Sequence, residues 1–77
     1  MEDEQTPRLR AELAEVEMDL VAVRKIAAQL RENVPEAEDP ADRGALIQSA
    51  DEQDEIAEQL LARRDDLRQR VAQAEHH

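Results

Sequence analysis

Apolar side chains recur along the first half of the chain at alternating intervals of four and three residues. They occupy Leu9, Leu13, Val16, Leu20, Val23, Ala27, Leu30 and Val34. An uninterrupted series of this kind is a heptad repeat, which lines the side of a helix that packs against a second helix. Thr6 is expected to be the N-cap, with Pro7 at the first helical position. Pro35 is expected to end the helix, because proline disfavours the helical conformation of the preceding residue, Val34.

The second half of the chain carries a matching series after a short interruption. Asp39 is a suitable N-cap and Pro40 suits the first helical position, so a new helix is predicted to begin there. The series that follows comprises Leu46, Ala50, Gln53, Ala57, Leu60, Arg64, Leu67, Val71 and Ala74. Gln53 and Arg64 are its two polar members. Both halves of the chain therefore have one side suited to helix packing.

We predict an all-α protein consisting of one antiparallel coiled-coil hairpin. The domain spans residues 1–77, with helix one over about 7–34, a loop over about 35–39 and helix two over about 40–74. Folding the chain at Pro40 aligns the two series so that the residue numbers of each facing pair add to 80. Val34 then faces Leu46, and Leu9 faces Val71.

The charged residues provide an independent test of this alignment. The fold sets Glu12, Glu15, Glu17 and Asp19 beside Arg63, Arg64, Arg68 and Arg70, and sets Arg24, Lys25 and Arg31 beside Asp51, Glu52, Asp54, Glu55 and Glu58. Opposite charges meet in both halves, whereas a parallel pairing would bring like charges together. The long Arg64 side chain is expected to cover Val16, with its head at Glu12, Glu15 or Glu17.

A second group of apolar residues has no place in this seam. It comprises Ala14, Met18, Val21, Ala28, Ile26, Ile47, Ile56 and Leu61. Since two helices bury only one side of each other, a second hairpin is expected to cover the remainder and form a homodimeric four-helix bundle. The predicted dimer face consists of Met18, Val21, Ile56 and Leu61. The alternative is that Ala and a single Met on a helix surface only favour helix formation.

Composition narrows the classes of function. The 77 residues include no Cys and no aromatic side chain, and the formal net charge is -10. Such a charge repels nucleic-acid phosphates, so no nucleic-acid partner is expected. No apolar run approaches the length of a membrane span, and the acidic first residues are unlike a signal peptide, so we expect a cytoplasmic protein without a membrane partner. Nine Arg against one Lys, with thirteen Ala, is typical of a GC-rich bacterial genome.

Catalytic and metal-binding chemistry is nearly absent from the sequence. Ser49 and Thr6 are the only hydroxyl side chains, and His76 and His77 lie together at the end of the chain. No nucleophile with a neighbouring base can be assembled, so we predict a protein that is not an enzyme and that has no catalytic residue, cofactor or metal site. The two His residues are interpreted as a terminal segment or the remnant of a purification tag.

The acidic loop supports one family resemblance. The run Asp39-Pro40-Ala41-Asp42-Arg43 resembles the hairpin tip of the DksA and TraR group of bacterial transcription factors, and the Gre transcript-cleavage factors share this acidic-tipped architecture. The resemblance implies a hairpin that enters the secondary channel of RNA polymerase, with Asp39 and Asp42 as the tip acids. Gly44 replaces the Ala of the motif. The zinc finger of DksA and the second domain of the Gre factors have no counterpart in the chain.

A further resemblance concerns architecture alone. The stretch from Ala50 to Leu67 is similar to the second helix of Rop, a hairpin that dimerises into a four-helix bundle. Two functions remain open from the sequence. The first is a non-catalytic interaction module, a small bacterial regulatory or adaptor protein that acts through protein-protein contacts. The alternative is an RNA polymerase secondary-channel modulator that uses Asp39 and Asp42. The acids at the tip serve as a partner contact in the second case and only as a helix cap in the first.

Overall fold

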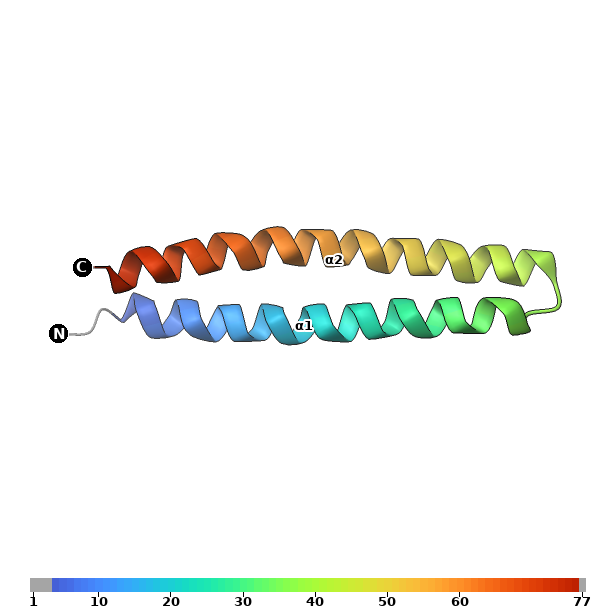
Figure 1. Ribbon diagram of the computed structural model, residues 1–77, viewed down its shortest axis with the longest axis horizontal. Coiled ribbons are helices and arrows are strands. Elements are labelled where there is room, and N and C mark those ends of the chain that lie inside the picture. The colour runs from blue at the N-terminus through green and yellow to red at the C-terminus, as the bar shows by residue number, and fades with distance from the viewer. Residues whose placement is uncertain (1–3, 77) are drawn as a thin grey trace.

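The computed structural model describes residues 4–76 and consists of two long helices that lie side by side (Figure 1). Helix α1 spans Gln5–Asn33, a 3-10 turn η1 spans Val34–Glu36, and helix α2 spans Pro40–Glu75. The protein is therefore all-α, and α1 and α2 pack against each other as an antiparallel hairpin. His76 follows α2 as its C-cap. Residues 1–3 and His77 lie outside the described residues.

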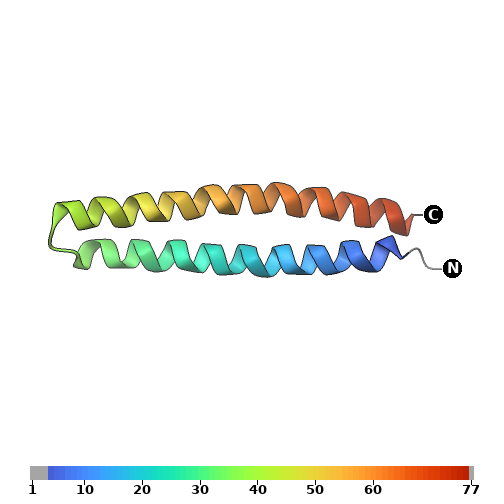
Figure 2. The same ribbon diagram turned by 180° about the vertical axis from the view of Figure 1, so that it is seen from behind.

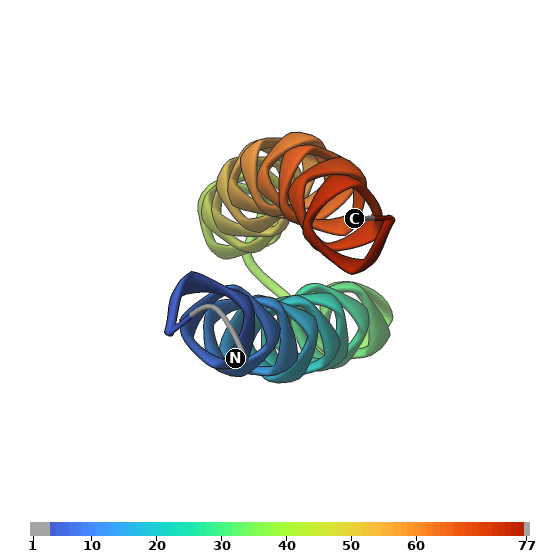
Figure 3. The same cartoon turned by 90° about the vertical axis from the view of Figure 1, so that its left-hand side faces the viewer.

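The hairpin is a thin rod. Its principal extents are 61 × 14 × 12 Å and its radius of gyration is 17.6 Å. A compact domain of this length would have a radius of gyration of about 11 Å. The start of α1 and the end of α2 lie at one end of the rod, and the connecting turn lies at the other (Figure 2). The helices wrap around each other with a left-handed twist (Figure 3), as a seven-residue apolar repeat requires.

The predicted seam is the inner face of the rod. Every one of its positions, from Leu9 to Val34 and from Leu46 to Ala74, is buried or half-buried. The buried members are Leu20, Ala27, Ala50, Ala57 and Leu67. The heptad interpretation is thus confirmed. The core is small because only one side of each helix takes part in it.

The ion pairs between the helices agree with the predicted alignment. They join Arg10 to Glu75, Glu17 to Arg68, Arg31 to Asp54 and Glu12 to Arg63. The residue numbers add to 85 in the first three pairs and to 75 in the last. The two sums lie equally far above and below 80, the sum for facing seam pairs, as expected for ion pairs on the two sides of one antiparallel seam. Both flanks of the rod therefore have the expected register.

Three local expectations are wrong. Helix α1 begins at Gln5 with Glu4 as its N-cap, so Thr6 lies inside the first turn. Pro7 is still accommodated there, because the first four N–H groups of a helix lack partners within it. Val34 keeps helical angles, with φ -57° and ψ -48°, before Pro35. The α-helix ends because Pro35 has no N–H to continue the ladder, and the chain becomes extended only at Ala37.

The third wrong expectation concerns Arg64. Its Nε and Nη2 atoms donate to Oδ1 of the adjacent Asp65 at 3.3 and 3.2 Å, rather than reaching an acid on α1. Glu12 and Glu17 are bound by Arg63 and Arg68 instead, at 3.0 and 3.3 Å. The flanking arginines reach the acids because they point along the sides of the rod. The stem of Arg64 occupies the seam, and its side chain is only 24% exposed.

Candidate functional site

The tip of the hairpin is held by hydrogen bonds of its own backbone and by one cap. The Ala37 N–H donates to the carbonyl oxygens of Asn33 and Val34, at 3.2 and 3.3 Å. Oδ1 of Asp39 accepts a hydrogen bond from the Ala41 N–H at 3.0 Å, and the Asp39 carbonyl accepts from Arg43 at 3.0 Å. The predicted N-cap role of Asp39 is confirmed.

The other tip acids do not converge with Asp39. Asp42 is exposed in the first turn of α2, where its charge suits the positive end of the helix dipole. Glu36 and Glu38 are exposed in and after η1. Within residues 4–76, no group of three or more His, Cys, Asp or Glu side chains is arranged to hold a metal ion. Local helix energetics therefore account for both Asp39 and Asp42, and their role toward a partner stays a prediction.

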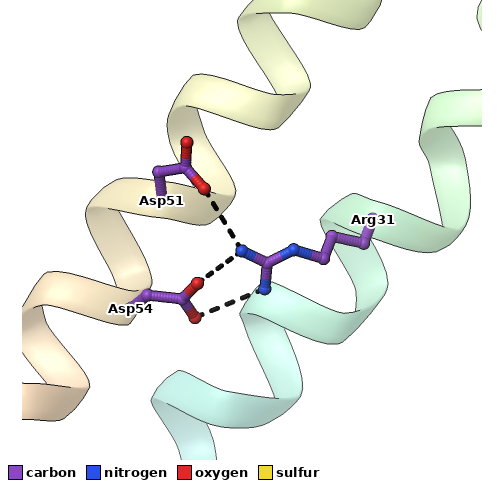
Figure 4. Close-up of polar contacts among 3 residues, drawn as sticks. All are labelled: Arg31, Asp51 and Asp54. Carbon is purple, nitrogen blue, oxygen red and sulfur yellow. Dashed lines mark hydrogen bonds and ion pairs between the residues drawn. The ribbon is translucent and has the colours of Figure 1, made fainter.

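A cluster of one base and two acids lies between the helices near the tip (Figure 4). The Arg31 guanidinium donates to both carboxylate oxygens of Asp54, with Nη1 to Oδ1 at 3.3 Å, and its Nη2 also donates to Oδ1 of Asp51 at 3.3 Å. The hydrogen bond with Arg31 lowers the pKa of Asp54 below its ordinary 3.8. The same bond raises the pKa of Arg31. A two-pronged contact of this kind fixes register, although its solvent exposure limits its strength.

The two flanks of the rod carry different ion pairs and different apolar residues. We call the side that carries the Arg10–Glu75, Glu17–Arg68 and Arg31–Asp54 pairs the Leu61 flank, because Leu61 immediately follows the seam position Leu60. The opposite side carries the Glu12–Arg63 pair. We call it the Ile56 flank, because Ile26 and Ile56 immediately precede seam positions there.

The structure separates the four residues of the predicted dimer face. Leu61 is half-buried on its flank, and Val21 lies next to that flank on the α1 side with Met18 one turn away. Ile56 belongs to the opposite flank, with 41% of its surface exposed. Met18 and Val21 are the most exposed large apolar residues of the described chain, at 73% and 69%. They line a shallow apolar depression together with Glu17 and Ala22.

Sequence periodicity alone did not distinguish the two flanks. Ile56 precedes the seam residue Ala57, whereas Leu61 follows the seam residue Leu60, and this offset places them on opposite sides of α2. The same counting assigns Ile26 to the side of Ile56. Ile26 and Ile47 are also exposed, at 43% and 48%, and were absent from the predicted dimer face. Counting from the nearest seam position would have identified both flanks.

In the stretch 4–76, no helix is both long and apolar enough to cross a membrane. Ser49 is half-buried in α2 and Thr6 is half-buried in the first turn of α1, in different helices and far apart along the rod. No protein-family model, no curated protein and no solved structure matches this chain.

Proposed function

We propose that this protein is a non-catalytic interaction module that forms a homodimer of hairpins, a four-helix bundle, and contacts another protein through its acidic surface. The observation that carries the proposal is the exposure of Met18 and Val21 at 73% and 69%. Large apolar side chains gain about 1.5–3 kcal/mol each on full burial. A single hairpin leaves that stabilisation unused on its outer surface.

The surface area of the rod supports association. The hairpin exposes 5972 Å², whereas a compact folded chain of 8.8 kDa exposes about 4,800 Å². The excess of about 1,200 Å² exceeds the about 800 Å² that each partner buries in an interface of standard size. A second hairpin laid along the first therefore has enough surface to bury, and a core of this size gains from the additional burial.

The acidic surface indicates the chemistry of a further partner. Twenty acidic side chains against ten basic ones leave a net charge of -10, spread along a rod 61 Å long. A basic protein surface would be attracted to such a rod at long range, and the attraction would weaken with added salt. We place this module in the bacterial cytoplasm as a regulatory or adaptor protein.

The alternative function is modulation of RNA polymerase through its secondary channel, with Asp39 and Asp42 as working residues. The structure gives Asp39 a local role as the cap of α2, with its Oδ1 bound to Ala41. An in vitro transcription assay separates the two functions. We expect the unaltered chain and the variants Asp39→Asn and Asp42→Asn to give the same polymerase output. An effect of the unaltered chain that both variants lose would favour the alternative, because Asn retains the cap and removes the charge.

Sedimentation equilibrium tests the homodimer directly. We expect a mass of twice 8.8 kDa for the unaltered chain at micromolar concentration. A monomer at high micromolar concentration would contradict the proposal. Because the interface would contain Met18 and Val21 rather than charged residues alone, the dimer should persist when salt is raised.

A further inference from the structure

The ion pairs of the Leu61 flank are interrupted at one level of the rod. The three pairs of this flank have residue numbers that add to 85, and the same spacing places Arg24 opposite Leu61. A cation thus faces an apolar residue where an acid would complete the series. Within residues 4–76, Arg24 has no hydrogen bond or ion pair. The interruption leaves both a charge and an apolar side chain available to a partner.

The interruption lies near the middle of the rod. Leu61 is at the level of residue 19 by the seam alignment, and α1 runs from Gln5 to Asn33. Val21 and Met18, both strongly exposed, lie beside the same level on α1. When a second rod is turned end over end and laid against the first, an apolar group at the centre of one rod meets the same group of the other. A two-fold symmetric contact needs this property, because the same patch must serve both subunits.

The charges on the Leu61 flank are also compatible with this two-fold symmetric contact. An antiparallel second copy, with the two-fold axis at Leu61, brings the second copy's Arg24 to the level of residue 14, which is three residues along α1 from Glu17. On α2 it places Asp54 opposite the second copy's Arg68. Each of these placements occurs twice, and each brings opposite charges near each other. Arg24 then has, within one helical turn, a carboxylate that its own hairpin does not supply.

The Ile56 flank does not fit in this way. The same end-over-end operation on that flank brings Asp19 close to the second copy's Asp19. On α2 it brings Ile56 toward the second copy's Arg63. Its apolar members, Ile26 and Ile56, are also less exposed than Met18 and Val21, at 43% and 41%. Association there would recover less apolar surface and would place like charges together.

We propose that a second copy of this chain docks on the Leu61 flank in antiparallel orientation, in an isologous contact centred on Leu61 and Val21. This inference rests on the proposed homodimer and adds the face and the orientation. Leu61 and Val21 of the two copies then lie next to the two-fold axis. Two identical residues at such an axis come close enough for a disulfide, which needs Cα atoms about 4.4–6.8 Å apart.

Single-cysteine variants test the proposal, because the chain has no Cys of its own. Leu61→Cys and Val21→Cys report on the proposed axis, and Ile56→Cys is the matched control on the other flank. Each variant is oxidised by air at micromolar concentration and followed on non-reducing gels. We expect the first two to form disulfide-linked dimers at least about tenfold faster than the control, because docking raises the effective concentration of the paired thiols.

Circular dichroism of each variant establishes that the hairpin is folded, and Val21→Cys keeps the test valid if Leu61→Cys unfolds. Sedimentation of the unaltered chain tests the homodimer separately from the docking face. A dimer whose Ile56→Cys variant cross-links as fast as Leu61→Cys or Val21→Cys, or faster, would overturn the docking face and leave the homodimer intact. A monomeric unaltered chain would overturn the homodimer and the docking face together.

Discussion

The tip half and the open half of the rod use the same seam in different ways. Toward the tip, three of the four α2 seam residues, Ala50, Gln53 and Ala57, are small or polar, and only Leu46 is large. Toward the chain ends, α2 contributes Leu60, Val71 and the fully buried Leu67, together with Arg64 and Ala74. The turn already holds the helices together at the tip, where contacts close only short loops. Contacts at the open end close the longest loops, so they require more apolar burial to form.

Ion pairs join the two helices in both halves of the rod. In the tip half, one guanidinium binds two carboxylates, and Asp39 caps the new helix at 3.0 Å. In the open half, Arg63 likewise pairs with two carboxylates, those of Glu12 and Asp66, and Asp66 also pairs with Arg70. The Arg10–Glu75 and Glu17–Arg68 contacts of this half are single pairs. Exposed pairs contribute at most about 1 kcal/mol each, so they set the alignment more than they set the stability. We therefore expect apolar burial in the open half to dominate the free energy of unfolding.

The largest expected effect follows from shortening a buried side chain in the open half. Leu67→Ala removes a side chain with no exposed surface and should lower the free energy of unfolding by about 2–5 kcal/mol. This loss is comparable to the whole stability expected of so small a domain. Urea unfolding followed by circular dichroism measures it. Ile26→Ala, at a 43% exposed position, is the control and should lose much less. Equal losses would contradict the assignment of the core.

The tip half should respond to enlargement instead. Ala50 has no exposed surface, and Ala50→Leu should push the helices apart and cost about 1–3 kcal/mol. Ala62→Leu, on the exposed side of α2, is the matched control and should be nearly neutral. The urea midpoints of both variants provide the comparison. A gain of stability for Ala50→Leu would mean that the tip half is not closely packed.

The cap at the tip should give a moderate effect that separates hydrogen bonding from charge. Asp39→Ala removes the acceptor of the Ala41 N–H and should cost about 0.5–2 kcal/mol. Asp39→Asn keeps an acceptor and should change the melting temperature very little. Thermal unfolding of the two variants side by side measures the difference. A large loss for Asp39→Asn would show that the negative charge, and not the hydrogen bond, stabilises the start of α2.

The smallest effect is the pH dependence of the Arg31 cluster. The hydrogen bond with Arg31 lowers the pKa of Asp54 in the folded state below 3.8. The contact therefore stabilises the hairpin above pH 3.8, and the stabilisation is lost as pH falls through the lowered folded pKa. Arg31→Gln should unfold at lower urea concentration than the unaltered chain at pH 6. The gap between the two should shrink as the pH falls below 3.8 and close once Asp54 is protonated in the folded state, and a gap independent of pH would contradict the ion pair.

The fold could be predicted from the sequence more fully than the contacts of single side chains. The hairpin and its register follow from the spacing of Leu, Val and Ala residues, since burial of one helix side tolerates few alternatives. The Asp39 cap was also predictable, because Asp before Pro at a helix start has few other low-energy arrangements. These features depend on backbone geometry and burial, which periodicity specifies.

The partner of Arg64 and the start of α1 were not predictable in the same way. Arg64 chooses between Asp65 and acids on α1, and the difference between such exposed contacts is small. The first turn of α1 around Thr6 has several alternative start positions of similar energy. The dimer face was only partly resolved from the sequence. Whether Ile56 and Leu61 share a side depends on their offset from the seam, which a list of surplus apolar residues does not contain.

Small-angle X-ray scattering of the unaltered chain tests the central claim most directly. The claim is that one hairpin completes its own seam and associates sideways with a second copy through its outer surface. We predict a scattering mass of twice 8.8 kDa with a longest dimension that stays near 61 Å, because the rods lie side by side. A monomeric mass, or a dimer close to twice as long as one hairpin, would contradict it.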